Sequence, residues 1–186
     1  MHRRHLNELL VRYAAIWPDE APLARRFAAF AAAHDDCLLR SCVPGHITAS
    51  AWIVAADGAR CLLTHHKKLG RWLQLGGHVD GESRIELAAL REAQEESGMS
   101  TFTFVRWQPD LVPLDLDVHV IPARGNEPAH DHWDVRFWLQ ATAGEDLVLS
   151  AESNDLRWFA PAELAAATQE ESVVRLARKV ASLQGR

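Results

Sequence analysis

Residues 76–99 decide the fold, and they read GGHVDGESRIELAALREAQEESGM. Residues 83–97 contain neither glycine nor proline, which predicts a helix from Ser83 that ends at Gly98. Ser83 and Glu86 have the spacing of a capping box, which would fix the helix start. The apolar residues 72–75 just before Gly76 predict a strand. The stretch therefore predicts a strand, a glycine turn and a capped helix in succession.

Three glutamates share one face of this helix. Glu92, Glu95 and Glu96 stand at positions i, i+3 and i+4, so their carboxylates emerge within about 100° of one another. Leu87 and Leu90 fall on nearly the opposite side, which we expect to face a sheet. Like charges at this spacing repel, and Mg²⁺ or Mn²⁺ would relieve the repulsion because both ions prefer carboxylate oxygens. The helix is thus predicted to hold a metal ion; the alternative is a solvated acidic face.

The same stretch resembles the signature of the Nudix hydrolases, G-x5-E-x7-R-E-U-x-E-E-x-G-U, in which U is an aliphatic residue. Residues 91–99 match its second half without a gap. In the first half, four residues instead of five separate Gly77 from Glu82, and eight instead of seven separate Glu82 from Arg91. This pattern indicates one residue displaced from the loop into the helix. We therefore expect Glu82 not to bind the metal directly, and Asp80 or Glu86 to supply instead the outer carboxylate that braces Arg91 or the metal waters.

The resemblance implies an α/β fold, the Nudix αβα sandwich with a mixed sheet, and a hydrolase that cleaves a diphosphate linkage in a nucleoside diphosphate joined to another group. It implies water attack at phosphorus and a Mg²⁺ cofactor, with Mn²⁺ as an alternative. The implied metal ligands are Glu92, Glu95, Glu96 and the Gly76 carbonyl. The implied general base is Glu92 or Glu95, and Arg91 would brace the glutamates and the glycine loop.

Further candidates lie downstream. Some Nudix enzymes carry a metal-binding or basic glutamate before the last core strand, where this chain has Glu152, with Asp155 as a competitor. Arg124 and His132 are candidate substrate contacts, since a guanidinium pairs with phosphate and an imidazole can bind polar groups. Because His130 and His132 flank the start of an expected strand, however, we favour the interpretation that both face solvent.

The rest of the chain divides into two parts. Apolar periodicity predicts helices over residues 6–17 and 23–31, so residues 1–45 are expected to form a helical N-terminal extension. Residues 46–186 are expected to form the Nudix hydrolase domain. Its further strands are expected at 47–55, 61–64, 102–107, 117–121, 134–141 and 156–159, and its last helices from Pro161 and over 173–183.

Composition excludes several other classes of protein. The 186 residues are 48% apolar and 24% charged, which is typical of a globular domain. The longest apolar run, residues 27–33, is too short for a membrane span. The net charge of −5 argues against a nucleic-acid partner. Three cysteines without a C-x-x-C pair predict a reducing, cytoplasmic environment and exclude a disulfide framework.

Two alternative functions stay open. A Nudix fold can sense a nucleotide without cleaving it, although such proteins typically lose glutamates that this chain retains. Isopentenyl diphosphate isomerases share the fold but need a cysteine beside the Gly-His of the turn, where this chain has Gly76. The expected partner is a small nucleotide-type diphosphate. A homodimer is compatible with the sequence, which fixes neither the oligomeric state nor the substrate.

Overall fold

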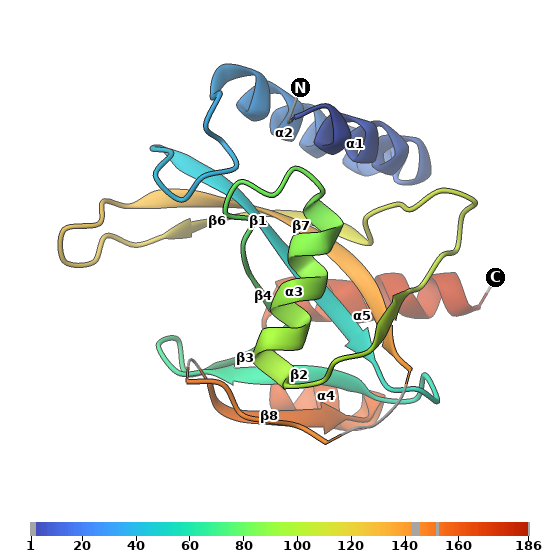
Figure 1. Cartoon of the computed structure of the whole chain (residues 1–186). Coiled ribbons are helices and arrows are strands. Elements are labelled where there is room, and N and C mark those ends of the chain that lie inside the picture. Colours follow the sequence, from blue (N-terminus) through green and yellow to red (C-terminus); the bar gives the residue numbers. More distant parts are fainter. Residues whose placement is uncertain (1–2, 143–145, 152, 186) are drawn as a thin grey trace.

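The computed structural model describes residues 3–142, 146–151 and 153–185. Within them, strands of one mixed sheet lie between helices (Figure 1). The elements are α1 (Arg4–Ile16), η1 (Pro18–Glu20), α2 (Ala21–Ala33), β1 (Gly45–Val54), β2 (Cys61–His66), β3 (Arg71–Leu73), β4 (Leu75–His78), α3 (Ile85–Ser97), β5 (Phe102–Phe104), β6 (Asp115–Ile121), β7 (His130–Ala141), β8 (Ser153–Phe159), α4 (Pro161–Ala167) and α5 (Glu171–Gln184).

The centre of the sheet is a long parallel pair of strands, β1 and β7. All other named strand pairs are antiparallel. On the edge of β1 opposite to β7, β4 pairs with the middle of the strand and β2 pairs with its end. The far edge of β7 is shared by β6 and β5 in the same way. The strand order confirms the mixed sheet predicted from the sequence.

Helices cover both faces of this sheet, α3 in front and α5 behind in Figure 1. Side chains alternate along β1, so Ile47 shares a core with Ala88 of α3. Trp52 points to the other face and shares a second core with Leu176 of α5. The α/β sandwich is therefore confirmed. None of the described helices is long and apolar enough to cross a bilayer.

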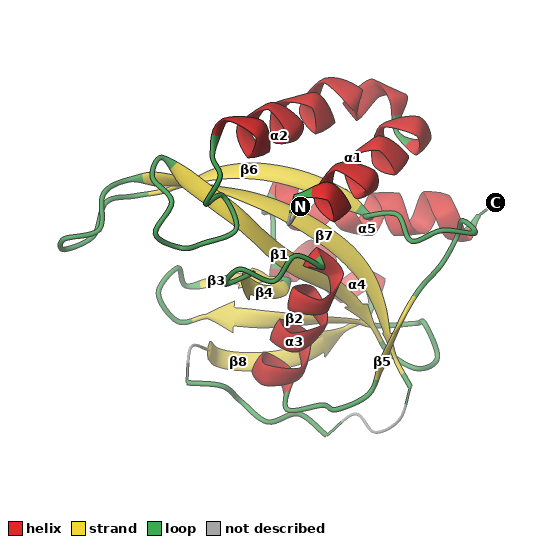
Figure 2. Cartoon of the chain, turned by 45° about the horizontal axis from the view of Figure 1, so that its top comes forward, coloured by secondary structure: helices red, strands yellow, loops and turns green. Residues whose placement is uncertain are grey.

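The two N-terminal helices precede the sheet and pack against it (Figure 2). Phe27 and Phe30 of α2 contact Trp133 of β7, with ring centroids 5.1 and 4.5 Å apart. His5 Nε2 of α1 lies 2.7 Å from Glu86 Oε2 of α3. Both helices occur where the sequence predicted them. The division of the chain after residue 45 stays a prediction.

The start of α3 differs from the prediction. The helix begins at Ile85, and its N-cap, Arg84, makes no side-chain capping bond. The capping box of Ser83 and Glu86 is therefore absent. Glu86 is 3% exposed, and its carboxylate pairs with the side chains of His5 and Arg84, with Arg84 Nε at 3.1 Å, instead of capping a backbone N–H.

The buried face of α3 also differs from the prediction. Ala88, Ala89 and Ala93 are buried, whereas Leu87 and Leu90 are only partly buried. Alanine lets a helix approach a sheet closely because its side chain is a single methyl group. The helix approaches the sheet through its alanines, and Leu90 packs beside them against the core that includes Ala51 and Leu75, as predicted.

Candidate active site

The glutamates of α3 lie against Gly76 and Gly77. The sequence predicted a turn at these glycines, but both lie within β4, where they pair with Ser50 and Ala49 of β1. The Gly76 N–H donates a hydrogen bond to Glu96 Oε2 at 3.1 Å. A Cβ added at Gly77 would lie 2.6 Å from Glu92 Oε2, and one at Gly76 would lie 2.3 Å from Ser50 Cβ. Gly76 thus requires glycine because Ser50 and the Ala49 backbone occupy the space of a side chain, whereas a side chain at Gly77 would displace the Glu92 carboxylate. The two glycines and the two carboxylates form one packed unit.

Arg91 connects this unit to the strand. Its Nη2 donates to the His78 backbone oxygen at 2.6 Å and to Glu92 Oε1 at 2.8 Å. Its Nε lies 3.9 Å from Glu95 Oε1. These are the contacts expected of a residue that braces the glutamates and the glycine loop. The catalytic roles of Arg91, Glu92 and Glu95 stay predictions.

The electrostatics of this unit favour a cation. Burial raises the pKa of Glu92, and the nearby charges of Glu95 and Asp80 add to this, while Arg91 opposes it. The Glu92 side chain is 15% exposed, and that of Glu95 is 63% exposed. One half-buried and one open carboxylate, with Glu96 beside them, offer the hard oxygen donors that Mg²⁺ and Mn²⁺ prefer. The residues present therefore fit such an ion.

The irregular spacing of the signature lies in the loop before α3, because the helix begins only at Ile85. The helix was expected to be capped by Ser83, eight positions before Arg91, but its N-cap is Arg84, seven positions before Arg91. The helix therefore contains no additional residue before Arg91. The interpretation that the extra residue lies in the helix is therefore wrong. Glu82 Oε1 accepts a hydrogen bond from the Arg84 N–H at 2.8 Å, and Glu86 faces His5. Glu86 does not brace Arg91 as expected, because its carboxylate pairs with the N-terminal helix.

The other predicted site residues lie elsewhere. Glu152 is outside the described residues. Asp155 is exposed on β8, and its Oδ1 accepts from the Leu156 N–H at 2.8 Å. Arg124 lies at the exposed tip of the projecting β6–β7 hairpin, paired through its backbone with Glu127 (Figure 1). The roles of Glu152 and Arg124 stay predictions.

The histidines of β7 do not face solvent as expected. β7 begins at His130, not at residue 134, and His130 is 7% exposed. His132 is partly buried. Its cross-strand neighbours in the sheet register are His46 of β1 and His119 of β6. His46 is 1% exposed. The expectation failed because β1 and β6 flank β7 here. The sequence signal that could have indicated this buried polar face is the alternation of His46, Thr48 and Ser50 along β1.

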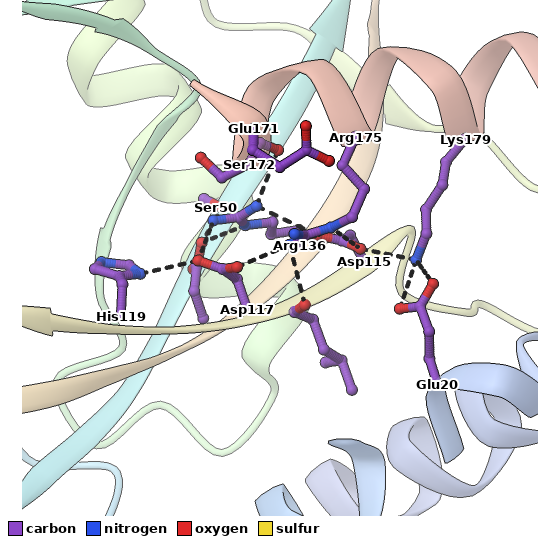
Figure 3. Close-up of polar contacts among 12 residues, drawn as sticks. Glu20, Ser50, Asp115, Asp117, His119, Arg136, Glu171, Ser172, Arg175 and Lys179 are labelled. Atoms are coloured by element: carbon purple, nitrogen blue, oxygen red, sulfur yellow. Dashed lines mark hydrogen bonds and ion pairs between the residues drawn. The ribbon is translucent and has the colours of Figure 1, made fainter. Parts of the chain in front are cut away.

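A charged network continues from these histidines along the same face of the sheet (Figure 3). Arg136 is 1% exposed, and its guanidinium lies 2.8 Å from Asp134, 2.9 Å from Asp117 and 3.3 Å from Asp115. Arg175 of α5 lies 2.8 Å from both Asp115 and Asp117. Buried charges are costly unless each is paired, and these carboxylates pair with guanidinium groups.

Lys179 extends the network to the N-terminal helices. Its Nζ lies 2.7 Å from Asp115 Oδ1 and 2.7 Å from Glu20 Oε1, and it donates to Tyr13 Oη at 2.8 Å. The Tyr13 hydroxyl donates in turn to Glu20. This network could not be predicted from the sequence, because its members are far apart along the chain.

Comparison with known proteins identifies the class of protein that has this fold and this glycine–glutamate unit. The sequence model of the NUDIX domain matches residues 44–180. The chain therefore belongs to the Nudix hydrolase family, whose members cleave pyrophosphate bonds in nucleoside diphosphate derivatives. The resemblance seen in the sequence is confirmed.

Particular relatives were found in both comparisons. The chain is 32% identical over 116 residues to "Putative 8-oxo-dGTP diphosphatase 3" of Mycobacterium tuberculosis, covering 59% of this chain and 48% of that protein. It thus spans about half the length of the curated relatives it matches. A Clostridium perfringens Nudix hydrolase superposes with a TM-score of 0.58 at 27% identity, over 75% of this chain and 96% of the other. A C. elegans Ap4A hydrolase gives 0.58 at 19% identity, over 75% and 97%, and so shows the fold alone.

Proposed function

We propose that the chain is a Mg²⁺-dependent hydrolase that cleaves a diphosphate linkage in a nucleoside diphosphate joined to another group. Mn²⁺ is the alternative ion, and water attacks at phosphorus. The observation that supports this most is the packing of Glu92 and Glu96 against Gly76 and Gly77, with Arg91 bound to the same loop. A rigid carboxylate platform next to the two glycines of β4 suits a cation that carries a diphosphate.

Each residue of this platform has a proposed role. Glu92, Glu95 and Glu96, with the Gly76 carbonyl, would hold the metal, which when bound neutralises the diphosphate oxygens. Arg91 fixes the orientation of Glu92 through the hydrogen bond between them. Glu92 or Glu95 orients the attacking water and takes up its proton.

The substrate is proposed only as a class, a nucleotide-type diphosphate. The names of the relatives and structural neighbours include the compounds 8-oxo-dGTP, Ap4A, dihydroneopterin triphosphate and ADP-ribose. These four compounds, with nucleoside diphosphate sugars, form the panel for a first screen. Arg124, His132 and Glu152 are the residues proposed to contact substrate or assist the base.

The test measures phosphate-product release by chelator-treated protein with and without Mg²⁺ or Mn²⁺. We expect turnover only with a divalent ion, loss of most turnover in Glu96→Gln, and no change in Glu8→Gln, a matched change in the exposed face of α1. Labelled water should place its heavy oxygen in a phosphate product. Activity in excess chelator, or label on a carbon, would contradict the proposal.

Two other functions are less well supported. A nucleotide sensor that does not cleave would bind panel compounds without product release, and the retained Glu92, Glu95 and Glu96 argue against it. An isomerase would need a cysteine at the turn, but Cys37, Cys42 and Cys61 are buried elsewhere. A cytoplasmic location and a homodimer stay predictions; sedimentation of the purified chain tests the second.

A further inference from the structure

Five histidines gather at the end of the sheet where β1 and β7 begin. His46 pairs with His132 across β1 and β7, and His119 pairs with His132 across β6 and β7. His78 of β4 and His130 of β7 complete the group, with ring centroids 4.9 and 5.0 Å from that of His46. Cross-strand partners and residues two apart share a face of a sheet, so all five rings point to the same side.

The ring nitrogens at the centre of this cluster lack ordinary partners. Among the described residues, neither nitrogen of His46 makes a hydrogen bond, nor does Nε2 of His132. The Cys42 backbone oxygen is near His46 but outside hydrogen-bonding geometry. Buried polar atoms are nearly always paired, with protein, water or an ion. Orphaned nitrogens on a ring that is 1% exposed therefore require an explanation.

Three of these rings converge on one point. One nitrogen each from His46, His130 and His132 lies within 4.8 Å of the others. His130 Nδ1 lies 2.9 Å from the Pro128 carbonyl oxygen, to which it donates when protonated there, leaving Nε2 as an acceptor. A backbone carbonyl that fixes the tautomer in this way is the usual companion of a metal-binding histidine.

We propose that His46, His130 and His132 form a binding site for a divalent transition-metal ion, with Zn²⁺ as the first candidate, distinct from the carboxylate platform of α3. Bonds of about 2.0–2.1 Å place the nitrogens of a tetrahedral zinc site about 3.4 Å apart, so each ring needs to move by about 1 Å or less. Three imidazoles leave a fourth position for His78 or water.

The chemistry of the donors separates this site from a magnesium site. Imidazole nitrogen suits Zn²⁺, Cu²⁺, Ni²⁺ or Co²⁺, whereas Mg²⁺ selects oxygen. The three rings are held on one face of the sheet with a nitrogen from each directed to the same point, so the donor set is assembled by the fold itself.

His78 places the two sites next to each other. Its ring faces His46 and His132, with centroids 4.9 and 5.3 Å away, while its backbone oxygen accepts the hydrogen bond from Arg91. His78 and Gly77 are adjacent in β4, and Gly77 faces Glu92. A metal held by the histidines would therefore lie on the face of β4 opposite to Glu92. The histidine site itself does not depend on the function proposed above.

The test is a Zn²⁺ titration of the full chain, prepared without a polyhistidine tag and freed of metal by a chelator. We expect one Zn²⁺ per chain by competition with a chromogenic chelator, and at least tenfold weaker binding in His132→Asn. His65→Asn is the matched control, a strand histidine that packs on Trp72 away from the cluster. Glu96→Gln should bind Zn²⁺ as the wild type does.

A second measurement avoids the risk that a variant fails to fold. In wild-type protein labelled with ¹⁵N at histidine, Zn²⁺ should shift the ring nitrogens of His46, His130 and His132 together and leave that of His65 in place. Equal Zn²⁺ binding by His132→Asn and wild type, loss of binding in Glu96→Gln, or unshifted cluster nitrogens would each overturn the proposal.

Discussion

Glu82 and Glu96 are both glutamates of the signature region, yet their surroundings differ. Glu96 accepts from the Gly76 N–H, whereas Glu82 accepts from Arg84 at the start of α3. We expect Glu82→Gln to retain activity within about threefold and Glu96→Gln to lose at least about a hundredfold, since even outer partners of a metal ligand are worth 10–100-fold. Steady-state kcat/KM with the best panel substrate measures both. Equal damage by the two substitutions would restore Glu82 as a metal ligand.

Asp117 carries a stability effect that depends on pH. Burial alone would raise the pKa of its carboxyl, but hydrogen bonds from His119 and Arg175 and the charge of Arg136 lower it overall. Its folded pKa is thus below the unfolded value of about 3.9, so the stabilisation is present above pH ~4 and lost as pH falls below that. We expect Asp117→Asn to lower the free energy of unfolding by about 3 kcal/mol at pH 7.

Urea unfolding at pH 7 and at pH 3 checks this expectation. The difference between Asp117→Asn and wild type should shrink at pH 3, because the wild-type carboxyl begins to protonate there in the unfolded chain. Asp57→Asn, at a side chain that is 58% exposed, is the control and should change stability little at either pH. A constant difference across this range would show that packing, not charge, dominates at Asp117.

At the scale of elements, the end of α3 depends on Gly98. This residue has φ +73°, and a Cβ there would lie 2.4 Å from Val148 Cβ. Gly58 has nearly the same φ, +72°, but nothing within 4 Å of an added Cβ. We expect Gly58→Ala to cost about 1 kcal/mol from backbone strain and Gly98→Ala about 2–4 kcal/mol from strain plus overpacking. Urea unfolding of both variants measures this, and equal losses would mean that the Val148 segment moves aside.

The two ends of α3 also show what the sequence could predict. Its end was predictable because a left-handed stop is a local property of glycine. Its start was not, because Glu86 is engaged by His5, far away in the chain. The face against the sheet was predicted only in part: Leu90 packs on the sheet core, but apolarity did not indicate that close approach needs Ala88 and Ala89. The glutamate cluster could be found by spacing, but the histidine cluster needed the register of three strands.

At the scale of the whole molecule, the N-terminal helices and the family domain share one core. The NUDIX match begins at residue 44, yet Leu9, Tyr13 and Phe27 are fully buried in the same cluster as Val135 of β7. Buried charges cross the boundary as well, since Lys179 of α5 pairs with Glu20. The extension and the domain are therefore expected to be one unit in stability, although they are two segments in sequence.

We therefore expect a chain of residues 44–186 to lose cooperative thermal unfolding and to bind a hydrophobic dye. Truncation uncovers Leu116 and Trp133, worth about 2 kcal/mol each. It also removes Glu20 from Lys179 and His5 from Glu86, at about 1.5–3 kcal/mol for each hydrogen bond to a charged group, although Asp115 and Arg84 stay as their other partners. Together these losses approach the 5–15 kcal/mol that stabilises a typical domain.

Circular dichroism during heating, with the full chain alongside, measures the effect of this truncation. Two point variants give a graded version of the test. Phe27→Ala, at a fully buried position, should cost about 3–5 kcal/mol, whereas Val11→Ala on the 71% exposed face of α1 should cost less than about 0.5 kcal/mol. A truncated chain that melts within a few degrees of the full protein would mean that the sheet is stable without the helices, and that the shared core contributes little to holding the hydrolase fold together.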